Sequence, residues 1–152
     1  MYLQSGDGTA LSLRPLRFEF PGAGGEDGRW LLIGGTVSLR DARSWSFQEP
    51  CLTFEEARSL GRWLLRVGHG HEHPHVAAEP PSPYTEPNLA FELVARDTDA
   101  ATIRTHLSAE VVPPWWPRPS LYDFHIDLTV PLAEVIRGAQ TWLHLLESLR
   151  VR

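Results

Sequence analysis

The residues with the clearest chemical capacity lie between positions 68 and 83, where histidines alternate with glycine, glutamate and proline. The alternating histidines are His69, His71, His73 and His75, with Glu72 among them. Imidazole nitrogens bind zinc, copper and nickel well, so this pattern could hold a metal ion. The same composition is also typical of a solvated loop that binds metal only adventitiously, because metal sites usually draw ligands from rigid elements. Both interpretations stay open.

A second row of titratable residues is Asp123, His125 and Asp127, which fall on one side of a segment with strand-like alternation. A carboxylate–histidine–carboxylate row could orient an imidazole for acid–base chemistry. No serine or cysteine lies near it in the sequence, and a solvent-facing strand surface is the favoured interpretation. We therefore take Asp123 and Asp127 as candidate partner-binding carboxylates.

The remaining candidates for catalysis are weak. Cys51 precedes a predicted helix N-terminus, which can lower a thiol pKa, but a lone cysteine is more often a small buried packing residue. The glycines at 22–28 contain neither a P-loop lysine nor a dinucleotide fingerprint. The sequence predicts no catalytic residue and no cofactor, and the protein is not expected to be an enzyme.

Tryptophan is abundant, with six copies in 152 residues. Trp63 and Trp142 fall in predicted helix stripes and are expected in the core. Trp115 and Trp116 lie between prolines in a loop, where they suit either a binding hot spot or packing over an edge of the core. Together with the loop 22–28, they are candidate contacts for a partner.

Two periodicities of apolar residues along the sequence, one typical of strands and one of helices, indicate the elements that must position these residues. Alternating polarity predicts strands at 11–20, 30–39 and 44–47, and again at 89–95, 103–111 and 122–130. In the first of these Leu16, Phe18 and Phe20 share one face. In the last, the apolar face carries Tyr122, Phe124, Ile126 and Leu128.

Two helices complete the pattern. Thr53 is a good N-cap, Glu56 stands at the third helical position to close a capping box, and Gly68 is placed to end the helix. An apolar stripe from Leu132 to Leu149 predicts a second helix, with Pro131 in its first turn.

The order is therefore three strands and a helix, repeated once. Short connections imply antiparallel pairing. We expect an α+β fold with one curved antiparallel sheet of about six strands and both amphipathic helices on one of its faces. Residues 1–152 are expected to form a single domain, with 68–83 as a His-, Pro- and Gly-rich loop within it.

Composition narrows the functional classes. The chain has 42% apolar and 22% charged residues, which is ordinary for a folded domain and argues against disorder. All 14 basic residues are arginines scattered along a chain of net charge -5, so the basic patch of a nucleic-acid binder is not expected. One cysteine, no visible signal peptide and no long apolar run predict a cytoplasmic protein that does not enter membranes.

Several stretches together resemble a known family. They are Arg43-Ser44-Trp45-Ser46-Phe47, then Pro50-Cys51-Leu52-Thr53, the helix with Leu60, Trp63 and Leu64, and the stretch from Thr85 to Leu93. With a segment rich in proline and tryptophan and a C-terminal helix, this pattern resembles the WapI-like family of bacterial immunity proteins over nearly the whole chain. The His-rich loop is not part of that pattern.

The resemblance implies a small cytoplasmic protein that protects its producer by binding the toxic part of a secreted toxin. It supplies no catalytic residues. The leading hypothesis is thus a non-enzymatic protein-binding module that neutralises a cognate bacterial toxin domain. The alternatives are a metal-binding protein or metal-dependent enzyme that uses the His-rich loop, and a structural protein that associates through a strand edge. The oligomeric state is left open.

Overall fold

The structure is a computed structural model that describes residues 1–20, 22, 29–74, 84–117 and 124–150. Its elements follow one another as β1 (Tyr2–Gln4), β2 (Ala10–Phe18), β3 (Trp30–Ser38), β4 (Ser44–Thr53), α1 (Phe54–His69), β5 (Leu89–Arg96), β6 (Ala100–Leu107), the short 3-10 helix η2 (Ala109–Val111), β7 (Phe124–Pro131) and α2 (Leu132–Arg150). The α+β class, with two helices and antiparallel strands, is confirmed.

The strands form two sheets rather than one. β1 to β4 pair in chain order as a four-stranded sheet, and β5 to β7 form a three-stranded sheet. The expected single sheet divides between β4 and β5, which α1 separates along the chain and which are not hydrogen-bonded neighbours. β1 was not expected, since three residues are too few to show alternation. It pairs with β2 through Tyr2 and Ser12.

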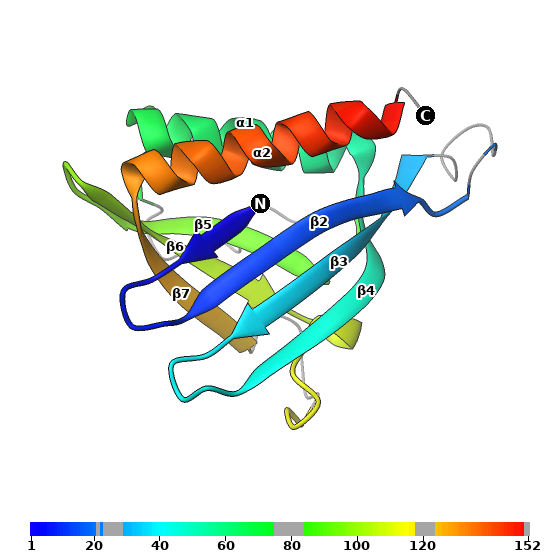
Figure 1. The fold of residues 1–152 in the computed structure, drawn as a ribbon, viewed down its shortest axis with the longest axis horizontal. Coiled ribbons are helices and arrows are strands. Elements are labelled where there is room, and N and C mark those ends of the chain that lie inside the picture. Colours follow the sequence, from blue (N-terminus) through cyan, green and yellow to red (C-terminus); the bar gives the residue numbers. More distant parts are fainter. Residues whose placement is uncertain (21, 23–28, 75–83, 118–123, 151–152) are drawn as a thin grey trace.

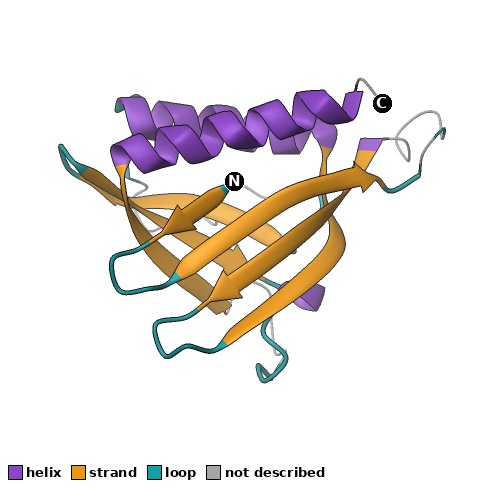
Figure 2. Cartoon of the chain, viewed as in Figure 1, coloured by secondary structure: helices purple, strands orange, loops and turns teal. Residues whose placement is uncertain are grey.

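The two sheets face each other, and both helices lie side by side across one end of the pair (Figures 1 and 2). The helices therefore contact both sheets instead of covering one face of a single sheet. One hydrophobic core receives side chains from every layer, including Leu13, Leu52, Ile103 and Trp142. The indole nitrogen of Trp142 donates to the Ala57 carbonyl at 2.6 Å, which joins α2 to α1 inside this core.

The capping box at the start of α1 is confirmed. The Thr53 hydroxyl accepts from the Glu56 amide, and the Glu56 carboxylate accepts from the Thr53 amide at 2.8 Å. The same carboxylate also accepts from the amide and hydroxyl of Thr85. Burial raises the pKa of Glu56, but these hydrogen bonds outweigh burial and hold the pKa below its ordinary value. Glu56 thus ties the helix start to the chain that leads into β5.

The predicted end of α1 at Gly68 was wrong. The helix continues to His69, and Gly70, with a φ of 79°, is the C-cap. Gly68 has a different role, since a Cβ there would lie 2.4 Å from the Ile136 side chain of α2. The close contact between α1 and α2 therefore requires glycine at position 68, and this residue does not serve to end the helix.

The predicted apolar face of the first strand was also wrong in part. β2 ends at Phe18, and its register with β3 shifts between Pro15 and Arg17. Leu11 and Leu13 face the core, whereas Leu16 lies on the other side of the sheet over Gly34, and Phe20 is 49% exposed. Because β2 contains one extra residue at this shift, the residues after it face the opposite side of the sheet from the one that regular alternation predicts.

The second half follows its prediction more closely. In β7, Ile126 and Leu128 are buried while His125 and Asp127 are exposed, as expected. The strand predicted at 103–111 instead runs from Ala100 to Leu107 and gives way to η2, where Ala109 has a positive φ of 55°. Tyr122 and Asp123 lie outside the described residues.

Candidate partner-binding surface

Trp115 and Trp116 do not stand alone in a loop but join an aromatic cluster. Trp115 meets Trp45 of β4 edge to face at 5.5 Å between ring centroids, and Trp116 meets Phe124 of β7 at 5.0 Å. Trp45 also contacts Phe124 at 5.6 Å. We call these four rings the aromatic cluster. It links the four-stranded sheet to the three-stranded sheet.

Trp45 holds this cluster in place. Its side chain is 7% exposed, and its indole nitrogen donates to the Val111 carbonyl of η2 at 2.9 Å. A buried indole normally needs such an acceptor. The alternation around Ser44 and Ser46 correctly predicted that Trp45 lies in a strand. Its partners lie about 70 residues further along the chain, so the local sequence could not predict these contacts.

Trp115 remains 41% exposed. The guanidinium of Arg43 lies over its ring at 4.9 Å and is paired with Asp41 at 2.8 Å. One side of this tryptophan packs on the edge of the core, as the packing interpretation expects. The other side is exposed, and its role in binding stays a prediction. A rigid, half-exposed indole beside a cation is the kind of group that anchors protein interfaces.

The outer face of the three-stranded sheet carries a charged row. Arg104 of β6 binds both carboxylate oxygens of Asp127 at 2.7 and 2.9 Å and lies 3.4 Å from Glu92 of β5. These hydrogen bonds from Arg104 hold the pKa of Asp127 below its ordinary value. Asp127 is therefore a fixed carboxylate in a bidentate pair rather than a free group.

Of the acid–base row, only His125 and Asp127 lie within the described residues, and these two form no hydrogen bond with each other. Both oxygens of Asp127 are bound to Arg104, which leaves His125 without this carboxylate as a hydrogen-bond partner in the described structure. The ring of His125 lies 5.7 Å from that of His106. Burial, and then the charge of Arg104, lower the pKa of His125. The lowered pKa favours the neutral imidazole in the fold, and the ring belongs to an exposed strand surface. Asp123 is outside the described residues.

The four candidate metal ligands are only partly described. His69 is the last residue of α1, its ring lies 6.3 Å from that of His71, and Glu72 pairs with Arg66. His75 lies outside the described residues. Within the described part of the chain, no group of three or more histidine, cysteine or carboxylate side chains is arranged to hold a metal. A metal site in this loop stays a prediction.

Cys51 is fully buried in β4. Burial, followed by the charges of Glu49 and other carboxylates, raises the pKa of its thiol to about 12. The thiolate that a nucleophile requires is therefore suppressed. The packing interpretation of this cysteine agrees with the structure, and the reactive one does not.

The model of the immunity protein WapI-like family matches residues 2–149. The chain belongs to the WapI-like immunity family. A search of curated proteins finds no match to it. None of the helices in the described ranges is long and apolar enough to cross a membrane.

The residues that carry the family resemblance mostly lie inside the fold. Trp45, Cys51, Leu60 and Leu64 are buried, and so is the apolar face of β5 with Phe91. The sequence motifs that carry the family resemblance therefore reflect packing inside the fold. The groups that are candidates for partner contact, Trp115 and the charged row, are both exposed. Strand β7 contributes Phe124 to the aromatic cluster and Asp127 to the charged row, on opposite sides of the strand.

Proposed function

We propose that this member of the WapI-like family is an immunity protein that neutralises a toxin domain by binding it, without catalysis. The observation that carries the proposal is the family match over residues 2–149. We further propose that the interface centres on the aromatic cluster and the charged row. This part is supported by the exposed indole of Trp115, held between Trp45 and Arg43.

The chemistry of this surface suits a protein partner. Trp115 and Trp116 offer large apolar area whose freedom is already restricted by packing, so little entropy is lost on binding. The Arg104–Asp127 pair on the outer face of the three-stranded sheet offers a fixed charged pair that a polar contact can use. Asp123 is included in the proposed contacts because it directly precedes β7.

The test first looks for a toxin-like gene adjoining the gene of this protein and expresses the toxin domain that it encodes. Binding is measured by calorimetry, and protection by growth of cells that express the toxin. Trp115→Ala should weaken binding by about 30-fold or more, the cost of losing a hot spot of about 2 kcal/mol. Asp127→Asn should weaken binding less. Phe20→Ala is the matched control, because it removes an aromatic ring that is also about half exposed.

The outcomes separate the two parts of the proposal. If the unmodified protein neither binds the toxin domain nor protects cells, the immunity function is wrong. If it does both and Trp115→Ala behaves like Phe20→Ala, the function stands and the proposed interface is wrong.

A further inference from the structure

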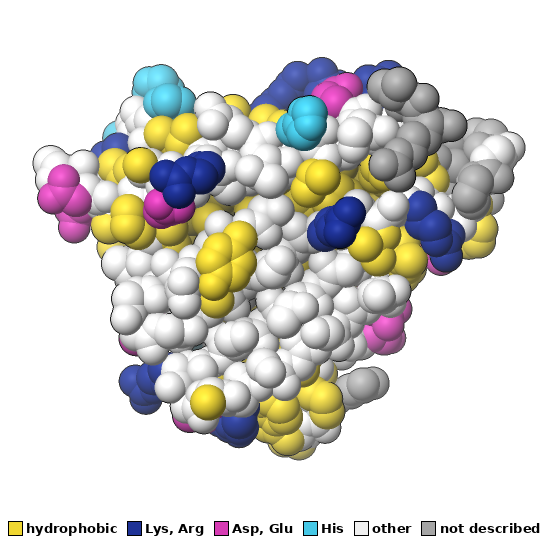
Figure 3. Space-filling model, viewed as in Figure 1, with side chains coloured by type: hydrophobic (Ala, Val, Ile, Leu, Met, Phe, Trp, Pro, Cys, Tyr) yellow, Lys and Arg dark blue, Asp and Glu magenta, His cyan; other side chains and the backbone are white. Residues whose placement is uncertain are grey.

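The lower end of the molecule in Figure 1 brings together the turn between β3 and β4 and the segment that follows η2. In Figure 3 this end shows apolar surface with arginine side chains beside it. The exposed ring here is Trp115, which lies in a turn where the Trp116 amide donates to the Pro113 carbonyl at 2.9 Å. The side chain of a surface turn residue keeps one orientation only if other parts of the chain contact it. The groups that touch this ring therefore decide how it is presented.

The turn between β3 and β4 supplies one of these contacts through Arg43. The guanidinium of Arg43 lies 4.9 Å from the centroid of the Trp115 ring, and Trp45 meets the same ring edge to face. An arginine over an indole is a favourable contact even at an exposed site. A free arginine side chain has many rotamers, so Arg43 restrains the ring only if its guanidinium is itself held.

Asp41 holds that guanidinium from within the same turn. Its Oδ2 atom accepts from the Nε atom of Arg43 and lies 2.8 Å from Nη2, and its Oδ1 atom accepts from the Arg43 amide at 3.1 Å. Between them, Ala42 has a φ of 67°, and its amide donates to the Leu39 carbonyl at 3.0 Å, which closes the turn. Residues other than glycine seldom adopt this φ, so its presence marks a turn whose shape is imposed by its surroundings.

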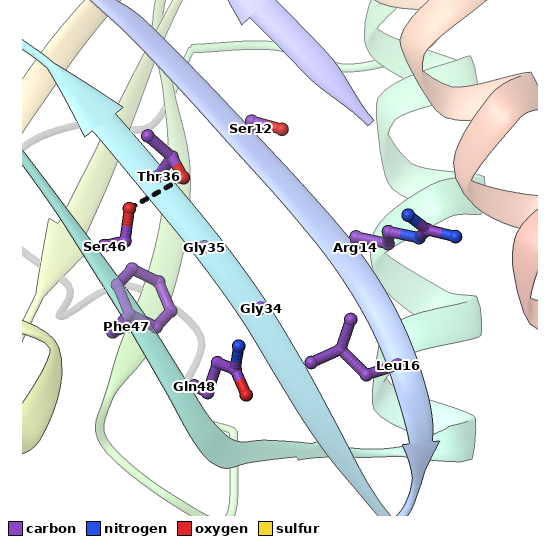
Figure 4. A pocket seen from close by; sticks show the side chains of 9 residues that line it. All are labelled: Ser12, Arg14, Leu16, Gly34, Gly35, Thr36, Ser46, Phe47 and Gln48. Atoms are coloured by element: carbon purple, nitrogen blue, oxygen red, sulfur yellow. Dashed lines mark hydrogen bonds between the residues drawn. The ribbon is translucent and has the colours of Figure 1, made fainter.

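Arg14, on the outer face of the same sheet, shows the contrast. It is the one charged residue that lines a hollow of about 490 Å³, and Figure 4 shows its side chain directed away from Gly34 toward the helices. Within the described part of the chain, no hydrogen bond or ion pair fixes this side chain. Arg43 differs because a carboxylate and an aromatic ring both contact its guanidinium, which therefore has a defined position.

We propose that Asp41 is a positioning residue, which acts through Arg43 to hold the exposed indole of Trp115 in one orientation for a protein partner. This inference rests on the interface proposed above and adds to it a residue that need not touch the partner. An exposed ion pair contributes little to the free energy of unfolding, so the expected effect is on the order of the ring rather than on stability. A ring that is ordered before binding loses less entropy when it is bound.

The first experiment measures the order of the indole groups in the free, full-length protein by ¹⁵N relaxation of the tryptophan Nε1 atoms. Trp115→Phe identifies the signal of Trp115. We expect its order parameter to be about 0.8 or higher in the unmodified protein and below about 0.6 in Asp41→Ala. Arg43→Gln should have the same effect, because Asp41 acts through Arg43. Trp45 and Trp142 are internal controls, since each indole donates to a carbonyl in the interior and should stay rigid.

Asp97→Ala is the matched control variant. Asp97 is likewise an exposed carboxylate of a hairpin turn, and its Oδ1 atom accepts from the amides of Asp99 and Ala100 at 2.8 Å. Its turn joins β5 to β6, so the order of Trp115 should not change in this variant. The proposal fails if Asp97→Ala loosens the ring as much as Asp41→Ala does, or if Asp41→Ala leaves the ring rigid.

The second experiment measures affinity for the toxin domain by calorimetry. Asp41→Ala should lower the affinity about threefold to tenfold, because one more side chain must then be ordered on binding. In the Trp115→Ala background the same change should have no further effect, since no indole is left to position. Equal losses in the two backgrounds would overturn the proposal, because Asp41 would then contact the partner itself. If the unmodified protein does not bind the toxin domain, the immunity function is wrong, whereas loss of indole order in Asp41→Ala would still establish the positioning role.

Discussion

At the scale of single residues, Trp45 combines a packing role with one hydrogen bond on which the aromatic cluster depends. Trp45→Phe keeps most of the apolar volume but leaves the buried Val111 carbonyl without its donor. We expect the free energy of unfolding to fall by about 1–3 kcal/mol, the usual cost of an unsatisfied buried group. Chemical denaturation measures this change.

The control for that variant is Trp115→Phe, at the exposed member of the same ring pair. It should lower stability by less than about 1 kcal/mol, as surface changes generally do. Equal losses in the two variants would show that the hydrogen bond to Val111 contributes little.

Cys51 supplies a second prediction at this scale. Because burial raises its thiol pKa to about 12, the native protein should resist alkylation by iodoacetamide at pH 8. In denaturant the same thiol should react at the rate of a free cysteine. Mass spectrometry of the two reactions checks this, and rapid labelling of the native protein would contradict the buried position of Cys51.

At the scale of elements, the contact between α1 and α2 depends on small residues. A Cβ at Gly61 would lie 2.6 Å from a methyl group of Leu143 and 3.0 Å from the indole of Trp142. That indole cannot move freely, because it is hydrogen-bonded to Ala57. Gly61 therefore lets the two helices approach closely.

The variant Gly61→Ala sets two effects against each other. Alanine improves helix propensity by about 1 kcal/mol, whereas overpacking a core costs about 1–3 kcal/mol. We expect a net loss of stability in thermal unfolding. Ser59→Ala, at an exposed position of the same helix, should instead be neutral or slightly stabilising. A gain in both variants would mean that α2 moves away without cost.

At the scale of the whole molecule, hydrogen-bonded carboxylates make stability depend on pH. The pKa values of Asp127 and Glu56 are lowered in the fold, as are those of Asp7, Asp41 and Asp97 in the turns. As pH falls below the ordinary carboxyl pKa values of 3.8 to 4.5, the unfolded chain therefore takes up more protons than the folded chain. Stability is present above this range and is lost as pH falls through the lower, folded values.

Thermal unfolding between pH 7 and pH 3 measures that loss. Asp127→Asn should lower stability at pH 7 and reduce the further loss below pH 4, because its titratable group is gone. His125 acts in the same direction at higher pH, since its pKa lies below 6.5 in the fold and its protonation favours the unfolded chain. His125→Asn should flatten the profile between pH 7 and pH 5. A pH profile unchanged in both variants would contradict these assignments.

The parts of the fold that could be predicted from the sequence are those set by neighbours along the chain. The capping box of Thr53 and Glu56 spans one helical turn. In β7, buried Ile126 and Leu128 alternate with exposed residues, which marks a strand with one face toward the core and the other toward solvent. The apolar stripe of α2 is equally local. In each case the interacting groups lie within a few residues, so residue type and spacing specify the geometry.

Tertiary structure decided what depends on distant partners. The division into two sheets, the helix contact at Gly61 and the meeting of Trp45 with Trp115 join segments dozens of residues apart, and no periodicity encodes them. The same holds for the surfaces. From the sequence, Asp127 looked like one carboxylate of an acid–base row, whereas in the fold both of its oxygens bind Arg104. Chemistry at a surface depends on the neighbours of a residue in space, and only the packed chain supplies those neighbours.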